Sequence, residues 1–81
     1  MTNQSQAAEP DFVGPNVTAL YAFVRRYGLP EPEVMPPHPH APIWTVFVDY
    51  NHDLTARTSH LLPDEAARLC VLRLEHFARD H

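Results

Sequence analysis

IWTVFVDY, residues 43–50, is the strongest β-strand signal in this chain and anchors the prediction of its fold. Isoleucine, valine, threonine and aromatic residues, which are enriched in β-strands, make up most of it. Asn51, His52 and Asp53 follow it and are typical of a turn. The stretch after them, 56–62, predicts a further strand, and the tight connection predicts that the two strands pair in an antiparallel hairpin.

Apolar residues at helical spacing lie on both sides of this hairpin. The stripe before it predicts a first helix over 17–27, with Asn16 as its cap and Gly28 just past its end. The stripe after it begins at Pro63, a residue type favoured at the first position of a helix, and runs to the end of the chain. The acidic pair at 64–65 suits the positive N-terminal end of that second helix.

Six of the nine prolines lie between the first helix and the hairpin, in 29–42. Within that region 31–35 predicts a short strand, which its prolines confine to an edge of the sheet. The order helix, three strands, helix therefore predicts an α+β fold, with a three-stranded antiparallel sheet and both helices packed on one face. The polar residues 1–14 predict a flexible N-terminal tail, and 15–81 the domain itself. The predicted core consists of Leu20, Val24, Trp44, Val46, Val48, Ala66, Cys70 and Leu74.

Composition and charge argue against several classes of protein. A chain of 81 residues allows one domain, and its single cysteine, Cys70, excludes an intramolecular disulfide. The formal net charge of −4 argues against a domain that depends on phosphate contacts, which is usually basic. The first residues lack the pattern of a signal peptide, and no apolar run approaches the ~20 residues that span a bilayer. We therefore expect an intracellular protein, cytoplasmic or nuclear, with no membrane contact.

Three segments in this order resemble the double-stranded-RNA-binding domain. NVTALYAFVRRYGLPEPEV, residues 16–34, resembles the first helix and strand of that family, including its Gly-Leu-Pro turn. HAPIWTVFV, residues 40–48, resembles the family segment His-x-x-x-Phe-x-Val-x-Val, with tryptophan in the aromatic place. PDEAARLCVLRL, residues 63–74, resembles the family helix Lys-Lys-x-Ala-Lys-x-x-Ala-Ala. The resemblance covers about residues 15–79 and implies the α-β-β-β-α fold.

The departures from the family pattern fall on residues that contact RNA. Family members insert a polar residue of the first helix into the RNA minor groove, where this chain has Ala22. At the start of the second helix, family lysines straddle the major-groove phosphates, and Pro63, Asp64 and Ala67 stand in their places. Arg68 lies nearby, but we expect Asp64, four residues before it, to neutralise its charge. The resemblance thus implies a member that keeps the core and has lost most RNA contacts.

Strand alternation predicts an interaction surface on the uncovered side of the sheet. Trp44, Val46 and Val48 match the inward positions of the family, so Ile43 and Phe47 are expected to be exposed on the open face. The third strand contains no proline and a single charge, so its edge can accept a partner strand. Some family members that have lost RNA binding dimerise or bind proteins through that strand, and the resemblance implies the same here. The predicted interaction residues are Ile43, Phe47, Arg57, Ser59 and Leu61.

The predicted function is a non-catalytic module for protein–protein interaction or homodimerisation, in an RNA-processing or RNA-silencing pathway. One alternative is weak, shape-based binding of double-stranded RNA, with Thr18, His40 and Arg68 as the remaining contacts. Another is a metal-binding domain, since His38 and His40 are close in sequence, although no zinc-ligand spacing is present. Cys70, on an apolar helix face, is typical of core packing. No catalytic motif or glycine-rich phosphate loop is recognisable, so we expect neither enzymatic activity nor a cofactor.

Overall fold

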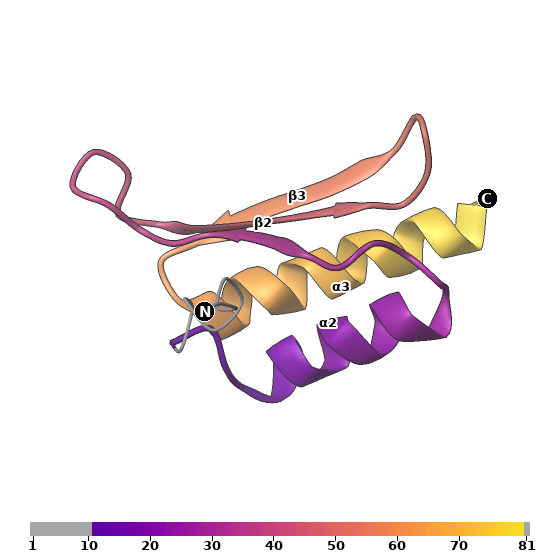
Figure 1. The fold of residues 1–81 in the computed structure, drawn as a ribbon, viewed down its shortest axis with the longest axis horizontal. Helices are drawn as coiled ribbons and strands as arrows, with labels where there is room; N and C mark the ends of the chain where they lie inside the picture. The colour runs from indigo at the N-terminus through magenta and orange to yellow at the C-terminus, as the bar shows by residue number, and fades with distance from the viewer. Residues whose placement is uncertain (1–10, 81) are drawn as a thin grey trace, which may run out of the picture.

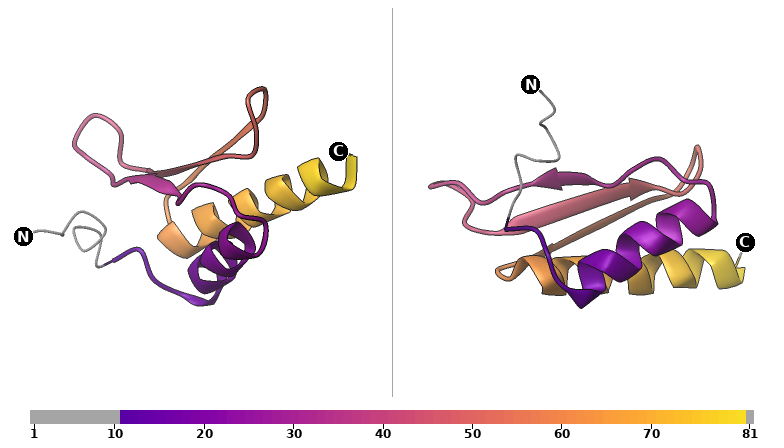
Figure 2. Two further views of the ribbon diagram at one scale, coloured as in Figure 1. Left: turned by 45° about the vertical axis from the view of Figure 1, so that its right-hand side comes forward. Right: turned by 60° about the horizontal axis from the view of Figure 1, so that its bottom comes forward.

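The computed structural model describes residues 11–80, which form two helices and one sheet. The order along the chain is α2 (Pro15–Arg26), β1 (Glu33–Met35), β2 (Trp44–Asp49), β3 (Thr55–His60) and α3 (Pro63–Asp80). The strands form an antiparallel sheet in the order β1-β2-β3, and both helices lie on the same side of it (Figures 1 and 2). This arrangement confirms the predicted α+β fold class.

The core lies between the sheet and the two helices. All eight predicted core residues are buried, including Trp44, Val46 and Val48, which alternate along β2. Alternation places every second side chain of a strand on the same face, so these three point toward the helices. Asn51 shapes the hairpin that follows β2, because its side-chain oxygen accepts the amides of Asp53 at 2.8 Å and Leu54 at 2.9 Å.

Gly28 ends α2, as predicted. Its φ of 65° is the left-handed conformation that favours glycine at a helix end. The amide of Leu29 donates to the carbonyl of Val24 at 2.9 Å, and that of Gly28 donates to Arg25 at 3.3 Å. This pair of bonds satisfies carbonyls that the last turn of a helix otherwise leaves free.

The start of α2 differs from the prediction. The helix begins at Pro15 rather than Val17, and Asn16 does not cap it. Instead, the Asp64 carboxylate on α3 accepts the backbone amides of Asn16 at 2.9 Å and Val17 at 3.0 Å. Its second oxygen accepts the Asn16 side-chain amide at 2.7 Å. Gly14 permits this approach, since a Cβ there would lie 2.2 Å from an Asp64 oxygen.

Phe12 extends the folded domain beyond its predicted boundary. Its side chain is buried, and its ring stacks on Trp44 with 5.9 Å between the ring centroids. The predicted tail covered 1–14, so its last part belongs to the folded domain, whereas 1–10 lie outside the described residues. A single aromatic residue outside any periodic stripe carries no local signal of burial, which is why the sequence did not indicate it.

Candidate interaction surface

The edge of the sheet formed by β3 has outward-facing backbone groups. The amide of Tyr50 donates to the carbonyl of Leu54 at 2.9 Å, and these two residues are directly opposite in the hairpin register. Hydrogen-bonded and non-hydrogen-bonded pairs alternate in an antiparallel ladder. Ala56, Thr58 and His60 therefore bond to β2, while Arg57 and Ser59 direct their amides and carbonyls away from the sheet.

The open face of the sheet is less apolar than the sequence indicated. Phe47 is half-buried rather than exposed, because the neighbouring strands place Glu33 and Arg57 on either side of it. The Arg57 guanidinium carbon lies 5.5 Å from the centroid of the Phe47 ring. Thr45 is only 8% exposed, and its hydroxyl is 3.0 Å from that of Ser59. Ile43 is also half-buried, so the open face has no exposed pair of apolar side chains at 43 and 47.

Of the five predicted interaction residues, three follow one edge. Arg57 and Ser59 belong to β3, and Leu61 comes directly after it with 67% of its side chain exposed. Leu62, also exposed, donates its amide to Nδ1 of His60 at 3.0 Å in the turn that leads to α3. The candidate surface is therefore the β3 edge and its end, rather than the middle of the open face.

A groove lies between this edge and α3. It has a volume of about 510 Å³. Its lining comes from Thr58 and Ser59 on β3 and from Leu69, Leu72, Arg73 and His76 on α3. Leu72 is 49% exposed, although it lies in a helix whose core face is fully buried. The groove was not predicted from the sequence, although the spacing 69, 72, 73, 76 marks a second stripe on α3.

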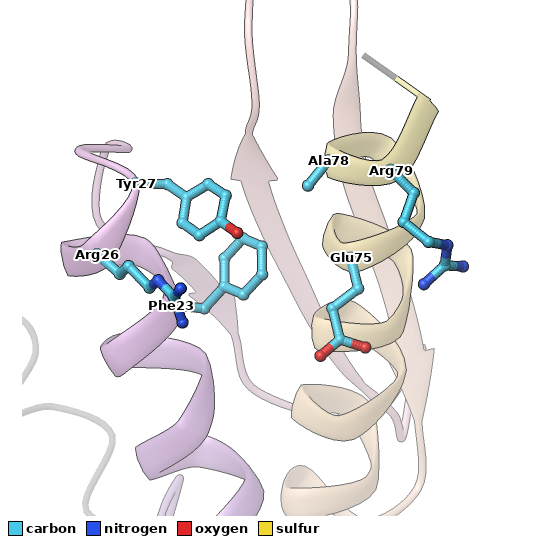
Figure 3. Close-up of a pocket in the computed structure, with 6 residues that line it drawn as sticks. All are labelled: Phe23, Arg26, Tyr27, Glu75, Ala78 and Arg79. Atoms are coloured by element: carbon cyan, nitrogen blue, oxygen red, sulfur yellow. The ribbon is translucent and has the colours of Figure 1, made fainter.

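A second groove, of about 460 Å³, separates the last turn of α2 from α3 (Figure 3). Phe23 and Tyr27 point across it toward α3, and their rings are stacked on each other at 4.4 Å. Arg26 lies 5.7 Å from the Tyr27 ring centroid, while Arg79 points away from the gap. The aromatic rings and Arg26 are thus engaged with one another rather than presented to a ligand.

The three candidate RNA contacts belong to the first turn of α2, the β1–β2 loop and the N-terminal half of α3. These three segments lie toward the same end of the molecule (Figure 1). Thr18 and His40 are exposed. Arg68 is also exposed, and its Nε donates to Glu65 at 2.8 Å. The expected pairing of Arg68 with Asp64 is therefore wrong, because the Asp64 carboxylate is occupied by the start of α2.

The start of α3 holds the three positions that the resemblance compares with phosphate-contacting lysines. Ala67, which stands in a family lysine position, is fully buried in the core cluster that contains Phe12. Asp64 is half-buried and bonded to α2. Of the three positions compared with family lysines, Ala67 thus lies in the core and Asp64 is hydrogen-bonded to α2, so neither side chain is free to contact a phosphate backbone.

His38 and His40 make contacts within the β1–β2 loop, and Cys70 lies in the core. The rings of His38 and His40 meet edge to face at 6.4 Å, in a loop closed by hydrogen bonds between His38 and Ala41. Within residues 11–80, no group of three or more His, Cys, Asp or Glu side chains is placed to hold a metal ion. Cys70 is buried, and burial raises its thiol pKa to about 11, against a smaller lowering effect of a Thr58 hydrogen bond. That thiol is protonated at neutral pH.

Comparison of the chain with protein-family models, with curated proteins and with solved structures finds no match. Neither helix within residues 11–80 is long and apolar enough to cross a bilayer. The geometry of the β3 edge and of the groove beside it is therefore the basis for proposing a function.

Proposed function

We propose that this chain is a non-catalytic module, similar to a double-stranded-RNA-binding domain, that mediates protein–protein interaction or homodimerisation through β3. The observation that carries the proposal is the outward direction of the backbone groups of Arg57 and Ser59 on an edge strand without proline. Such a strand offers donors and acceptors to a further strand. An RNA-processing or RNA-silencing pathway is the proposed setting.

A homodimer would form by pairing two copies of β3 about a two-fold axis, since isologous contacts are the commonest kind. A register that opposes Arg57 with Arg57 of a second copy places like charges together and is unfavourable. An axis at Thr58 avoids this, because Arg57 then lies opposite Ser59 of the second copy. Both residues direct their backbone groups outward, as this pairing requires.

The experiment is the molecular mass of the chain in solution against concentration, measured by light scattering for the wild type, Ser59→Pro and Ser59→Ala. Proline removes the outward amide of Ser59, so we expect Ser59→Pro to abolish association. Ser59→Ala is the matched control, since both variants lose the hydroxyl contact with Thr45. Circular dichroism verifies that each variant folds. Association that survives Ser59→Pro would move the interface elsewhere, and a wild type that stays monomeric would leave only a foreign partner.

A second candidate function is weak binding of double-stranded RNA, which is favoured by the exposure of Thr18, His40 and Arg68 on segments that lie toward the same end of the molecule. The ion pair between Arg68 and Glu65 and the structural role of Asp64 weigh against it. We expect a ~20 bp duplex to bind no more tightly than the ~10⁻⁴ to 10⁻⁶ M of nonspecific contacts at physiological salt. Submicromolar binding in an RNA titration would make RNA the principal ligand.

A further inference from the structure

The β3 edge and the groove beside it form one continuous site. Arg57 and Ser59 direct backbone groups outward, and Ser59 also lines the groove. A strand added beside β3 would therefore project every second side chain over α3. Leu72 offers apolar surface there, with 49% of its side chain exposed.

The positions of the groove residues along α3 determine which side chains a bound strand needs, and at what spacing. Because α3 follows β3 through a short turn, the groove runs from Leu69, nearest that turn, past the adjacent Leu72 and Arg73 to His76. Four residues of helix advance ~6 Å, and alternate residues of a strand lie ~6.8 Å apart. An apolar side chain over Leu69 would therefore place the side chain two residues away over Arg73, four residues further along α3.

Charge distinguishes the possible partners. Within residues 11–80, Arg73 has no ion-pair partner, whereas His76 lies 3.0 Å from Asp80. β3 itself, TARTSH, contains Arg57 and no acidic residue. The side chains of β3 on the helix side of the sheet are those of Ala56, Thr58 and His60, so a second copy would bring no carboxylate toward Arg73. An acidic strand from a different protein is the complementary occupant.

We propose that the groove between β3 and α3 binds an extended acidic segment of a foreign protein as a fourth strand. The segment carries an apolar residue that packs on Leu69 and Leu72, and an acidic residue two positions away that pairs with Arg73. The proposal rests on the proposed function, the use of the β3 edge, and adds to it the chemical class of the partner.

The probe is a fluorescent peptide of about seven residues, in which threonines surround one central valine and two glutamates. Each glutamate lies two positions from the valine, so the peptide has the same pattern in both directions and presents an acid to Arg73 either way. The control peptide has lysines in place of the glutamates. Fluorescence anisotropy with the full chain measures both affinities, at low and at physiological salt. We expect the acidic peptide to bind at least about fivefold more tightly, with the difference shrinking as salt increases.

Two variants with the same charge change test the location of the site. Arg73→Glu should remove or invert the preference for the acidic peptide. Arg79→Glu, on α3 but in the other groove, should leave the preference unchanged. Amide chemical shifts of Arg57, Ser59 and Leu72 should move when the acidic peptide is added, and those of residues beside β1 should not.

The outcomes separate this inference from the proposed function. Equal binding of the two peptides, or a preference that Arg79→Glu removes as well as Arg73→Glu does, overturns the acidic partner. The acidic partner is also overturned if neither peptide binds. In each case the β3 edge still stands as an interface if association in solution is lost in Ser59→Pro. If neither peptide binds and the wild type shows no association that depends on Ser59, both proposals are wrong.

Discussion

The first turn of α3 and its middle use polar and apolar residues in opposite ways. In the first turn, charged Asp64 is half-buried and holds the start of α2, and Ala67 is fully buried. In the middle, apolar Leu72 is half-exposed beside β3, and Arg73 is exposed. The acid thus contributes to the fold and the leucine to the surface. The type of a residue on a helix therefore does not establish whether it serves structure or recognition.

The largest loss of stability is expected from a substitution at Ala67, the buried residue near the start of α3. Ala67→Lys inserts a long charged side chain into a packed site, at a cost of more than about 3 kcal/mol in the free energy of unfolding. A domain of this size has a total stability of about 5–15 kcal/mol, so the variant should lose a large share of it and melt at least about 12 °C lower. Thermal unfolding followed by circular dichroism measures this. The matched control is Ala22→Lys, the same substitution at an exposed site on α2. Equal melting temperatures for the two variants would show that Ala67 lies at the surface.

The middle of α3 provides a pair of leucines that separates core from groove. Leu74 is fully buried, whereas Leu72 is half-exposed, two residues away on the same helix. Leu74→Ala should lower the free energy of unfolding by about 2–5 kcal/mol. Leu72→Ala should change it by no more than about 0.5 kcal/mol, because an exposed side chain leaves no cavity. Urea unfolding of both variants tests this. A comparable loss of stability in both would place Leu72 in the core and remove the groove.

A smaller loss of stability is expected when the hydrogen bonds between Asp64 on α3 and the start of α2 are removed. Asp64→Ala removes the acceptor for two backbone amides of α2 and should cost about 1–2 kcal/mol. For a domain of this size that corresponds to a fall of about 4–16 °C in the melting temperature. The control is Asp53→Ala, which makes the same charge change in the exposed hairpin turn. If Asp53→Ala destabilises the protein as much as Asp64→Ala does, the cap contributes nothing.

The candidate site was only partly predictable. The β3 edge was indicated by the absence of proline in 56–62, and Arg57, Ser59 and Leu61 do follow that edge. Alternation also placed Phe47 on the open face correctly. It did not indicate that Glu33 and Arg57 flank its ring, because cross-strand neighbours depend on register and on side-chain conformation. The groove next to α3 was not predicted, since its lining comes from two elements.

The elements, their order and most of the core could be read from local patterns in the chain. Strand composition, helical periodicity and a glycine at the end of a helix act within a few residues, so they can be recognised in a short stretch of chain. The place of Phe12 in the core, the burial of Ala67 and the capping of α2 by Asp64 are instead set by tertiary packing. The hydrogen bond from Asn16 to Asp64 joins residues 48 positions apart. No local pattern encodes such a contact, because it exists only once the packing of α3 against α2 has brought the two positions together.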